Sequence, residues 1–214
     1  MEDILHIRDA RSEEIARRFF VVFVDIFQVH GARRILDLGC GQGFFLRLLK
    51  DRGIECVGVE VDEELCRLAA EDGLDVMQMD LLSYLSGSSD RFDGCFASHI
   101  IEHFPPVQVT KMFELIHGIM EPGGILCIVT PNIANLRRAV GDFWRDPTHV
   151  RPYPVQALKK LLEKTGWSVI RSGYHTHRPA SIKREIVYGI RNFLFGKYWT
   201  PDSLYVVAGK PRGD

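Results

Sequence analysis

The sequence predicts an α/β fold in which a doubly wound, mostly parallel sheet of seven strands is covered by helices on both faces. Short runs rich in β-branched residues alternate with stretches of helical periodicity, and this alternation is typical of a parallel sheet. The right-handed rule for crossover connections then places helices on both faces. The expected strands are 34–38, 55–60, 75–79, 92–98, 124–130, 167–172 and 204–209.

Apolar side chains recur every three to four residues in the segments between these strands, which indicates helices. An earlier helix begins where Ser12 precedes Glu13 and Glu14, a pattern that favours a helix start. We expect this helix, within residues 1–31, to pack on a core formed by residues 32–214. The other expected helices are 44–51, 62–71, 106–120 and 154–164.

Composition limits the classes of protein that the chain can represent. Its 214 residues suffice for one domain with a full core, and a net charge of −1 argues against a general binder of long nucleic acids. The five cysteines form no Cys-x-x-Cys pair, which indicates buried free thiols in a reducing compartment. The charged first residues do not resemble a signal peptide, and the longest apolar stretch, 19–24, is shorter than the ~20 residues that span a bilayer. We therefore expect a cytoplasmic protein.

Glycines alternate with other residues where the first expected strand meets the next helix. Gly39, Gly41 and Gly43 lie between an apolar run that ends at Leu38 and another that begins at Phe44. Glycines in a turn let a ligand approach the backbone closely. The dinucleotide fingerprint requires a third glycine three residues after the second, and a P-loop requires Gly-Lys-Ser/Thr; the sequence has neither. The turn therefore predicts a ligand-binding site that has no evident phosphate-binding motif.

The run Asp37-Leu-Gly-Cys-Gly-Gln-Gly43 resembles the first motif of class I S-adenosylmethionine-dependent methyltransferases. The resemblance implies a Rossmann-like methyltransferase fold and S-adenosylmethionine (SAM) as cofactor, with its methionine end over the glycine turn. We expect Asp37 to tie the amide groups of the loop and to help orient the ammonium group of the cofactor. Gly39, Cys40, Gly41 and Gly43 are the loop residues that the resemblance assigns to the cofactor.

Two carboxylates follow the turn at spacings that suit the rest of the cofactor. Glu60 lies 21 positions after Gly39 at the end of the second expected strand, where a carboxylate can accept hydrogen bonds from ribose hydroxyls. Asp62 suits the cap of the next helix. The family places an acidic residue after the third strand, where it accepts the adenine amino group beside a backbone amide that binds a ring nitrogen. The resemblance carries these roles to Asp80 and Leu81.

Histidines follow the fourth expected strand. The Glu102-His103 pair resembles the Glu-His of several subfamilies, including the ubiquinone-pathway O-methyltransferases. Asp146-Pro-Thr-His149 resembles the Asp-x-x-His segment of methyltransferases associated with glycan and lipopolysaccharide synthesis. Imidazole titrates near neutral pH, so we expect His103 or His149 to act as the general base for a hydroxyl. His99 is expected beside the cofactor.

Two other interpretations of these residues stay open. His99, Glu102, His103 and His149 offer three nitrogens and one oxygen, a set that can hold a transition metal. Small-RNA 3′-terminal ribose methyltransferases have a metal site after this strand, although His99 stands where their first glutamate would be. In the structural interpretation, Glu102 and His103 cap the helix near Pro105, and His149 binds a loop. We favour the base and expect no metal.

Two segments, near 132–154 and 176–201, lie outside the expected elements. Insertions at the carboxyl ends of strands usually carry substrate contacts. The second contains a basic amphipathic pattern over 182–197, which predicts either a lid or a peripheral contact with the anionic inner face of a membrane.

These observations favour methyl transfer from SAM to a hydroxyl of a small-molecule, glycan-like or lipid-linked acceptor. One alternative is a catalytically silent cofactor-binding scaffold, and another is a metal-dependent RNA ribose 2′-O-methyltransferase. The near-neutral charge argues against the latter. The sequence predicts no oligomeric state.

Overall fold

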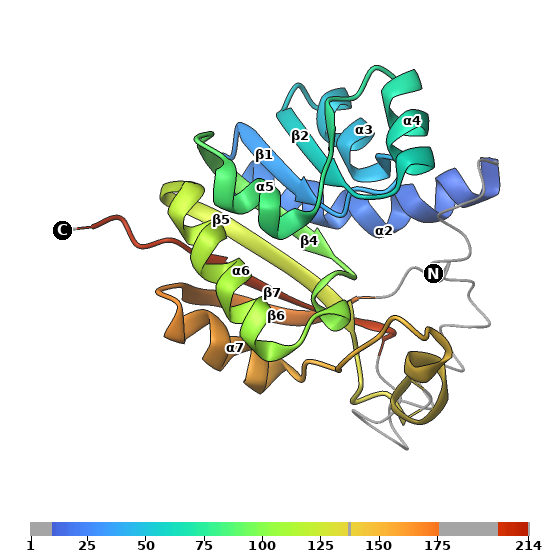
Figure 1. The fold of residues 1–214 in the computed structure, drawn as a ribbon, viewed down its shortest axis with the longest axis vertical. Helices are drawn as coiled ribbons and strands as arrows, with labels where there is room; N and C mark the ends of the chain where they lie inside the picture. Colours follow the sequence, from blue (N-terminus) through green and yellow to red (C-terminus); the bar gives the residue numbers. More distant parts are fainter. Residues whose placement is uncertain (1–9, 137, 176–200, 214) are drawn as a thin grey trace.

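The computed structural model describes residues 10–136, 138–175 and 201–213. This part of the chain contains a seven-stranded sheet with the order β3-β2-β1-β4-β5-β7-β6 (Figure 1). The seven-stranded prediction is therefore confirmed. The strands are β1 (Arg34–Leu38), β2 (Glu55–Glu60), β3 (Val76–Gln78), β4 (Phe92–Ser98), β5 (Met120–Pro131), β6 (Ser168–His175) and β7 (Ser203–Gly209).

The sheet is mostly parallel. Strands β2 and β3 lie on one side of β1, and β4 to β7 lie on the other, so the strand order reverses between β1 and β4. β1 pairs in parallel with both β2 and β4, whereas β7 lies between β5 and β6 and runs antiparallel to both. Leu38, the last residue of β1, lies beside Val59 and Ala97. The residues that follow these three strands therefore meet at one edge, at the switch point where open α/β sheets bind ligands.

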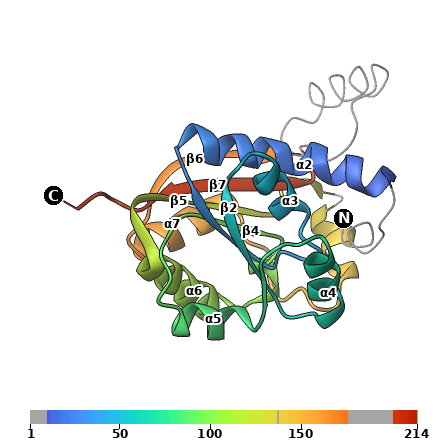
Figure 2. The ribbon, with the colours of Figure 1, turned by 90° about the horizontal axis from the view of Figure 1, so that it is seen from above.

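Helices cover both faces of the sheet (Figure 2). Helix α2 (Ala10–Val29) lies on one side together with α3 (Phe44–Asp51), and α5 (Leu81–Gly87) and α6 (Pro106–Ile119) lie on the other. Helix α7 (Val155–Lys164) buries Leu158 and Leu162 in the same core as α5 and α6. Helix α4 (Glu63–Glu71) packs Ala69 against Leu46 of α3.

Helix α2 contacts the sheet through a row of phenylalanines. Phe19, Phe23 and Phe27 recur every four residues and are at most 1% exposed. Their rings pack with those of Phe45 from α3 and Phe96 from β4, whose centroids lie 4.1 Å apart. This aromatic layer fixes α2 and α3 next to the carboxyl end of β1, where the glycine turn begins.

Most predicted boundaries agree with the observed ones, and the differences have local causes. Helix α3 has the predicted bounds, and Asp62 caps α4 as expected, since its Oδ1 accepts from Leu65 N at 2.9 Å. Strand β5 begins at Met120 rather than at the expected residue 124, because Phe92 pairs with Met120 before a register shift. Helix α5, the 3₁₀ helices Ile101–His103 and Phe143–Arg145, and the π-helix Arg138–Asp142 were not predicted.

No helix in the described ranges is long and apolar enough to cross a membrane. All five cysteines have free thiols; four are buried and Cys56 is half-buried, as their apolar surroundings predict. The expected amphipathic stretch at 182–197 lies outside the described residues, so the membrane contact stays a prediction.

Candidate active site

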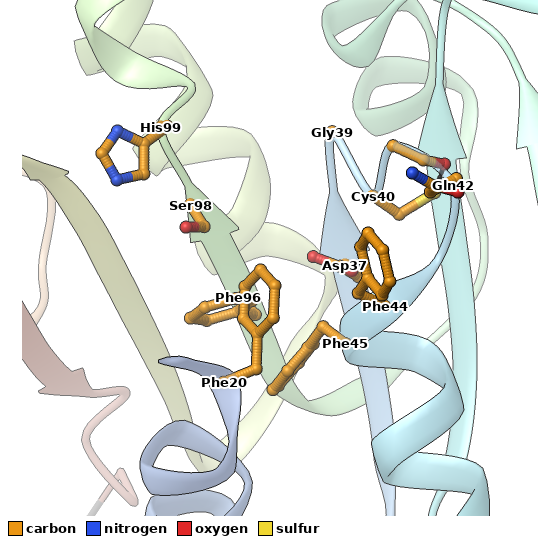
Figure 3. Close-up of a pocket in the computed structure, with 11 residues that line it drawn as sticks. Phe20, Asp37, Gly39, Cys40, Gln42, Phe44, Phe45, Phe96, Ser98 and His99 are labelled. Atoms are coloured by element: carbon orange, nitrogen blue, oxygen red, sulfur yellow. Dashed lines mark hydrogen bonds between the residues drawn. The ribbon is translucent and has the colours of Figure 1, made fainter. Parts of the chain in front are cut away.

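A pocket opens at the carboxyl ends of β1 and β4, where the strand order changes direction (Figure 3). The glycine turn forms one wall, residues at the end of β4 form the opposite wall, and aromatic rings and a carboxyl group lie between them. The lining residues are Phe20, Asp37, Gly39, Cys40, Gly41, Gln42, Phe44, Phe45, Phe96, Ser98 and His99.

The glycines of the turn have different structural duties. Gly39 has φ +69°, and a Cβ at this position would overlap the side chain of Ile100. Gly41 has φ +54°, but a Cβ there would meet no atom within 4 Å. Gly39 is therefore required for packing, whereas Gly41 keeps the approach to the loop backbone open for a ligand.

The amide groups of the turn are bound by β2. The N–H groups of Gly39 and Cys40 donate to Val59 O at 2.8 and 3.2 Å. The N–H of Gly41 donates to Oε2 of Glu60 at 2.9 Å. These amides thus bind Val59 and Glu60, so the expectation that Asp37 ties them is wrong for these three groups.

Asp37 lies within the pocket, between the glycine turn and the aromatic rings (Figure 3). Its side chain is buried, and burial raises the pKa of this carboxyl well above its usual range, with a further contribution from the charge of Glu60. A cationic ligand group in the pocket would favour the ionised carboxylate. Asp37 is therefore a buried carboxyl group of the pocket lining, and its contact with the ammonium group of a cofactor stays a prediction.

Glu60 lies at the carboxyl end of β2, next to the loop rather than in the lining of the pocket. In addition to Gly41 N, its carboxylate accepts hydrogen bonds from Val61 N at 2.8 Å and Asp62 N at 3.0 Å. An ionised carboxylate has about four lone-pair positions, so three amide bonds leave capacity for a ligand hydroxyl. The sequence predicted that Glu60 lies at the end of the second strand, but it did not predict these hydrogen bonds from backbone amides.

The residues predicted for adenine lie further along the same edge. Asp80 is exposed and caps α5, its Oδ1 accepting from Ser83 N at 2.9 Å, while Leu81 is buried. Two apolar side chains next to the carboxyl ends of β2 and β3 are exposed, Val61 at 67% and Met79 at 41%. Like Glu60, Asp80 and Leu81, Gly43 is outside the pocket lining, and it serves as the N-cap of α3.

His99 belongs to the wall opposite the glycine turn. Its Nδ1 lies 3.1 Å from Oε1 of Glu102, and its Nε2 lies 3.3 Å from Oγ of Ser203. Glu102 is fully buried, and its Oε2 accepts from the hydroxyl of Thr130 at 3.0 Å. The structure thus places His99 in the pocket lining, and its contact with the cofactor stays a prediction.

His103 and His149 lie together beyond Glu102, outside the lining of the pocket. Their ring centroids are 4.8 Å apart, and one ligand atom from each of Glu102, His103 and His149 lies within 4.8 Å of the other two. His103 Nδ1 is 2.9 Å from Oγ1 of Thr148, whose hydroxyl donates to Asp146 Oδ1 at 2.5 Å. Because the single hydroxyl proton goes to the carboxylate, Thr148 accepts from Nδ1–H of His103, which leaves the lone pair on Nε2.

His149 has the same tautomer for another reason. Its Nδ1 lies 2.6 Å from the carbonyl oxygen of Phe143, which can only accept, so Nδ1 carries the proton. The predicted loop contact of His149 is therefore present. Helix α6 begins at Pro106 without a side-chain cap, so the interpretation of Glu102 and His103 as its caps is wrong.

Several residues of the pocket and its surroundings were not predicted from the sequence. Thr148 lies within the Asp-x-x-His segment, and its part in orienting His103 follows only from the folded loop. The side chains from α2, α3 and β4 read as ordinary core residues, and only the position of Gln42 within the glycine turn carried a signal. The missed pocket residues are Phe20, Gln42, Phe44, Phe45, Phe96 and Ser98.

Residues 8–172 match the methyltransferase domain family. The human mitochondrial ubiquinone biosynthesis O-methyltransferase is 26% identical over 155 residues, which cover 64% of this chain and 42% of that protein. The ubiquinone biosynthesis O-methyltransferase of Aeromonas salmonicida is 32% identical over 106 residues, which cover 47% of this chain and 44% of that protein. The chain thus spans less than half the length of these curated relatives.

Solved structures show the same fold. A SAM-dependent methyltransferase from Archaeoglobus fulgidus superposes with a TM-score of 0.71 at 26% identity, covering 91% of this chain and 97% of that one. Magnesium protoporphyrin IX methyltransferase from Synechocystis PCC 6803, with bound SAM, gives a TM-score of 0.63 at 15% identity, covering 95% and 82% of the two chains. Together with the seven-stranded sheet and the glycine turn, these matches show that the chain belongs to the class I SAM-dependent methyltransferases.

Proposed function

We propose that the protein transfers the methyl group of SAM to a hydroxyl of a small-molecule, glycan-like or lipid-linked acceptor. One observation carries the proposal: the pocket beside the glycine turn ends at His99, whose Nδ1 lies 3.1 Å from Oε1 of Glu102, and Glu102 in turn lies beside the imidazoles of His103 and His149. Acidic and basic groups at this position suit removal of a hydroxyl proton. Two relatives are named O-methyltransferases, which supports oxygen as the acceptor atom.

The residues present fit the cofactor. Asp37 offers a buried carboxyl for its ammonium group, and Gly41 leaves the loop backbone accessible. Glu60 has remaining acceptor capacity for the ribose, and Asp80 with Leu81 would bind adenine. The exposed side chains of Val61 and Met79 offer apolar surface on that side. When bound, SAM supplies an electrophilic methyl group on a sulfonium; the protein supplies position and a proton acceptor.

The assignment of the base to His103 or His149 stays a prediction. Each ring is held through Nδ1, so each presents Nε2 as its acceptor nitrogen. This arrangement also suits two imidazoles that orient the acceptor hydroxyl by hydrogen bonds.

A specific observation favours a second form of the same function, in which Glu102, His103 and His149 bind a divalent metal. Their ligand atoms converge within 4.8 Å, and both imidazoles donate Nδ1–H to outer acceptors, as metal-bound histidines do. We nevertheless expect activity to survive a chelator, with substoichiometric metal by elemental analysis. Loss of activity on chelation, restored by a divalent ion, would establish the metal-dependent form.

The proposed function is tested by incubating the protein with methyl-labelled SAM and fractionated cell extracts. We expect label in a product whose methyl group is attached to oxygen, identified by mass spectrometry. Calorimetry with the demethylated cofactor provides the control for binding. Cofactor binding without any labelled product would support the alternative of a catalytically silent scaffold. Label on nitrogen or carbon would exclude the O-methyl assignment.

A further inference from the structure

The two halves of the glycine turn, residues 39–43, are bound by different elements. Amide groups of the first half donate to β2. The carbonyl oxygen of Gln42, in the second half, accepts from Nη1 of Arg47 on α3 at 3.0 Å. Gln42 is 2% exposed and lines the pocket, so Arg47 holds a part of the pocket wall from the side of α3.

The same guanidinium contacts an aromatic ring of the pocket. Cζ of Arg47 lies 4.6 Å from the centroid of the Phe44 ring, which is the geometry of a cation–π contact. Phe44 is 7% exposed and lines the pocket beside the glycine turn, whereas Arg47 does not belong to the lining (Figure 3). Arg47 therefore reaches the pocket through Gln42 and Phe44 rather than by direct contact with a ligand.

A carboxylate of a second helix fixes the direction of the guanidinium. Nη1 of Arg47 also donates to Oδ2 of Asp72 at 2.5 Å, and the two side chains are 25% and 31% exposed. Asp72 is the C-cap residue of α4, where a negative charge is unfavourable unless a cation compensates it. Hydrogen bonds between two charged groups are short and strong. The contact therefore restricts Arg47 to the direction in which it meets Gln42 and Phe44.

These three contacts meet at one side chain. We infer that Arg47 is a positioning residue of the cofactor site, which holds the Gln42 carbonyl and the Phe44 ring in the arrangement that SAM requires. Its planar fork suits this role, because it offers several donors in fixed directions and a face that stacks on an aromatic ring. An ammonium group has no such plane, so lysine reproduces only part of the contacts. This inference rests on the pocket beside the glycine turn being the SAM site.

An ion pair that only stabilises the fold would behave differently from a positioning contact. Removal of such a pair lowers the stability, but the pocket keeps its shape in every molecule that remains folded. Removal of a positioning contact lets the turn and the ring move within the folded protein, so the affinity for the ligand falls as well. The two roles therefore differ in the ligand affinity of the folded protein.

Calorimetry of the full chain with the demethylated cofactor is the first test. We expect Arg47→Met, which keeps an unbranched apolar stem, to weaken binding about tenfold, roughly the effect of one charge-assisted hydrogen bond. Arg47→Lys should recover part of this loss. Arg52→Met is the matched control and should bind as the parent does, since Arg52 follows the same helix and pairs with Asp25 on the surface at 3.2 Å. Thermal unfolding verifies that each variant is folded at the temperature of the titration.

A double-mutant cycle is the second test, because it measures whether Arg47 acts through the ring. Residues that work as a unit show non-additive effects, whereas independent residues do not. Arg47→Met should therefore cost less affinity in a Phe44→Leu background than in the parent, with a coupling of about twofold or more in Kd. Strictly additive losses of affinity would overturn the inference, since they would show that the guanidinium does not act through Phe44.

The possible results separate this inference from the site on which it rests. If the parent protein does not bind the demethylated cofactor, the assignment of the site fails before the variants are compared. If the parent binds it and folded Arg47→Met binds it equally well, Arg47 only stabilises the fold while the site stands. Neither binding test requires an acceptor, so failure of the O-methyl assignment leaves them unchanged.

Discussion

At the scale of single residues, the carboxyl group of Asp37 should make the affinity for a cationic ligand depend on pH. Burial raises the pKa of its carboxyl above the unfolded value, so folding favours the protonated form. The associated stability is present at low pH and is lost as pH rises from the unfolded pKa towards the raised folded one. A cationic ligand favours the ionised form, so its affinity should rise with pH over the same range.

We therefore expect Asp37→Asn to weaken SAM binding and to abolish this pH dependence. The same change should raise the free energy of unfolding at neutral pH, because the amide has no proton to lose. Calorimetry over a pH series measures the affinity, and thermal unfolding measures the stability. Asp75→Asn, on an exposed carboxyl, is the control; a parent affinity that does not change with pH would contradict the assignment.

Two glycines of the turn make a matched pair at the same scale. Both have positive φ, so alanine is strained at either position by roughly 1–2 kcal/mol. Only at Gly39 does the new Cβ also overlap Ile100, whereas at Gly41 it enters open space. Gly39→Ala should therefore lower the melting temperature more, while Gly41→Ala should remain folded and lose affinity for the demethylated cofactor. Equal cofactor affinity in Gly41→Ala and the parent would show that the ligand does not approach this face of the loop.

At the scale of elements, helix α2 contributes separately to the core and to the pocket. Phe23 is fully buried among the rings of Phe19 and Phe96, whereas Phe20 lines the pocket. Phe23→Ala should lower the free energy of unfolding by about 3–5 kcal/mol, the usual cost of a large buried ring. Phe20→Ala should cost less stability and change ligand affinity more. Chemical denaturation and calorimetry on both variants measure the two effects, and a reversed order would contradict the separation.

The elements also show what sequence patterns can and cannot predict. Helix α3 was predicted with its observed bounds because Gly43 interrupts the chain and the apolar residues after it recur at helical spacing. Helix α5 spans only seven residues, which is too short for a periodic pattern to show. Its N-cap, Asp80, was predicted to bind adenine and not to begin a helix. The left-handed backbone of His99, with φ +56°, and the contact of Ser203 with its ring depend on packing between distant segments, which periodicity does not encode.

At the scale of the whole molecule, the pocket joins segments that are far apart in the sequence. It takes residues from α2, β1, the glycine turn, α3 and β4, so a ligand there binds the native arrangement rather than the unfolded chain. We expect the demethylated cofactor at 100 times its Kd to stabilise the fold by about 2.7 kcal/mol. A thermal shift series measures this, with Gly41→Ala as the control that should show a smaller shift. A parent melting temperature unaffected by the ligand would contradict the location of the site.

The antiparallel strand β7 links two parts of the fold whose formation depends on the same strand pairing. It pairs with β5 through seven residues, from Ile125 opposite Gly209 to Pro131 opposite Ser203, although about seventy positions separate the two strands in the chain. Until that pairing forms, one side of β5 presents unpaired backbone groups that another chain can join. The same pairing delivers Ser203 to His99. The pairing of β7 with β5 therefore covers this side of β5 and completes the surroundings of His99 together, so that a copy in which β7 has not paired lacks both.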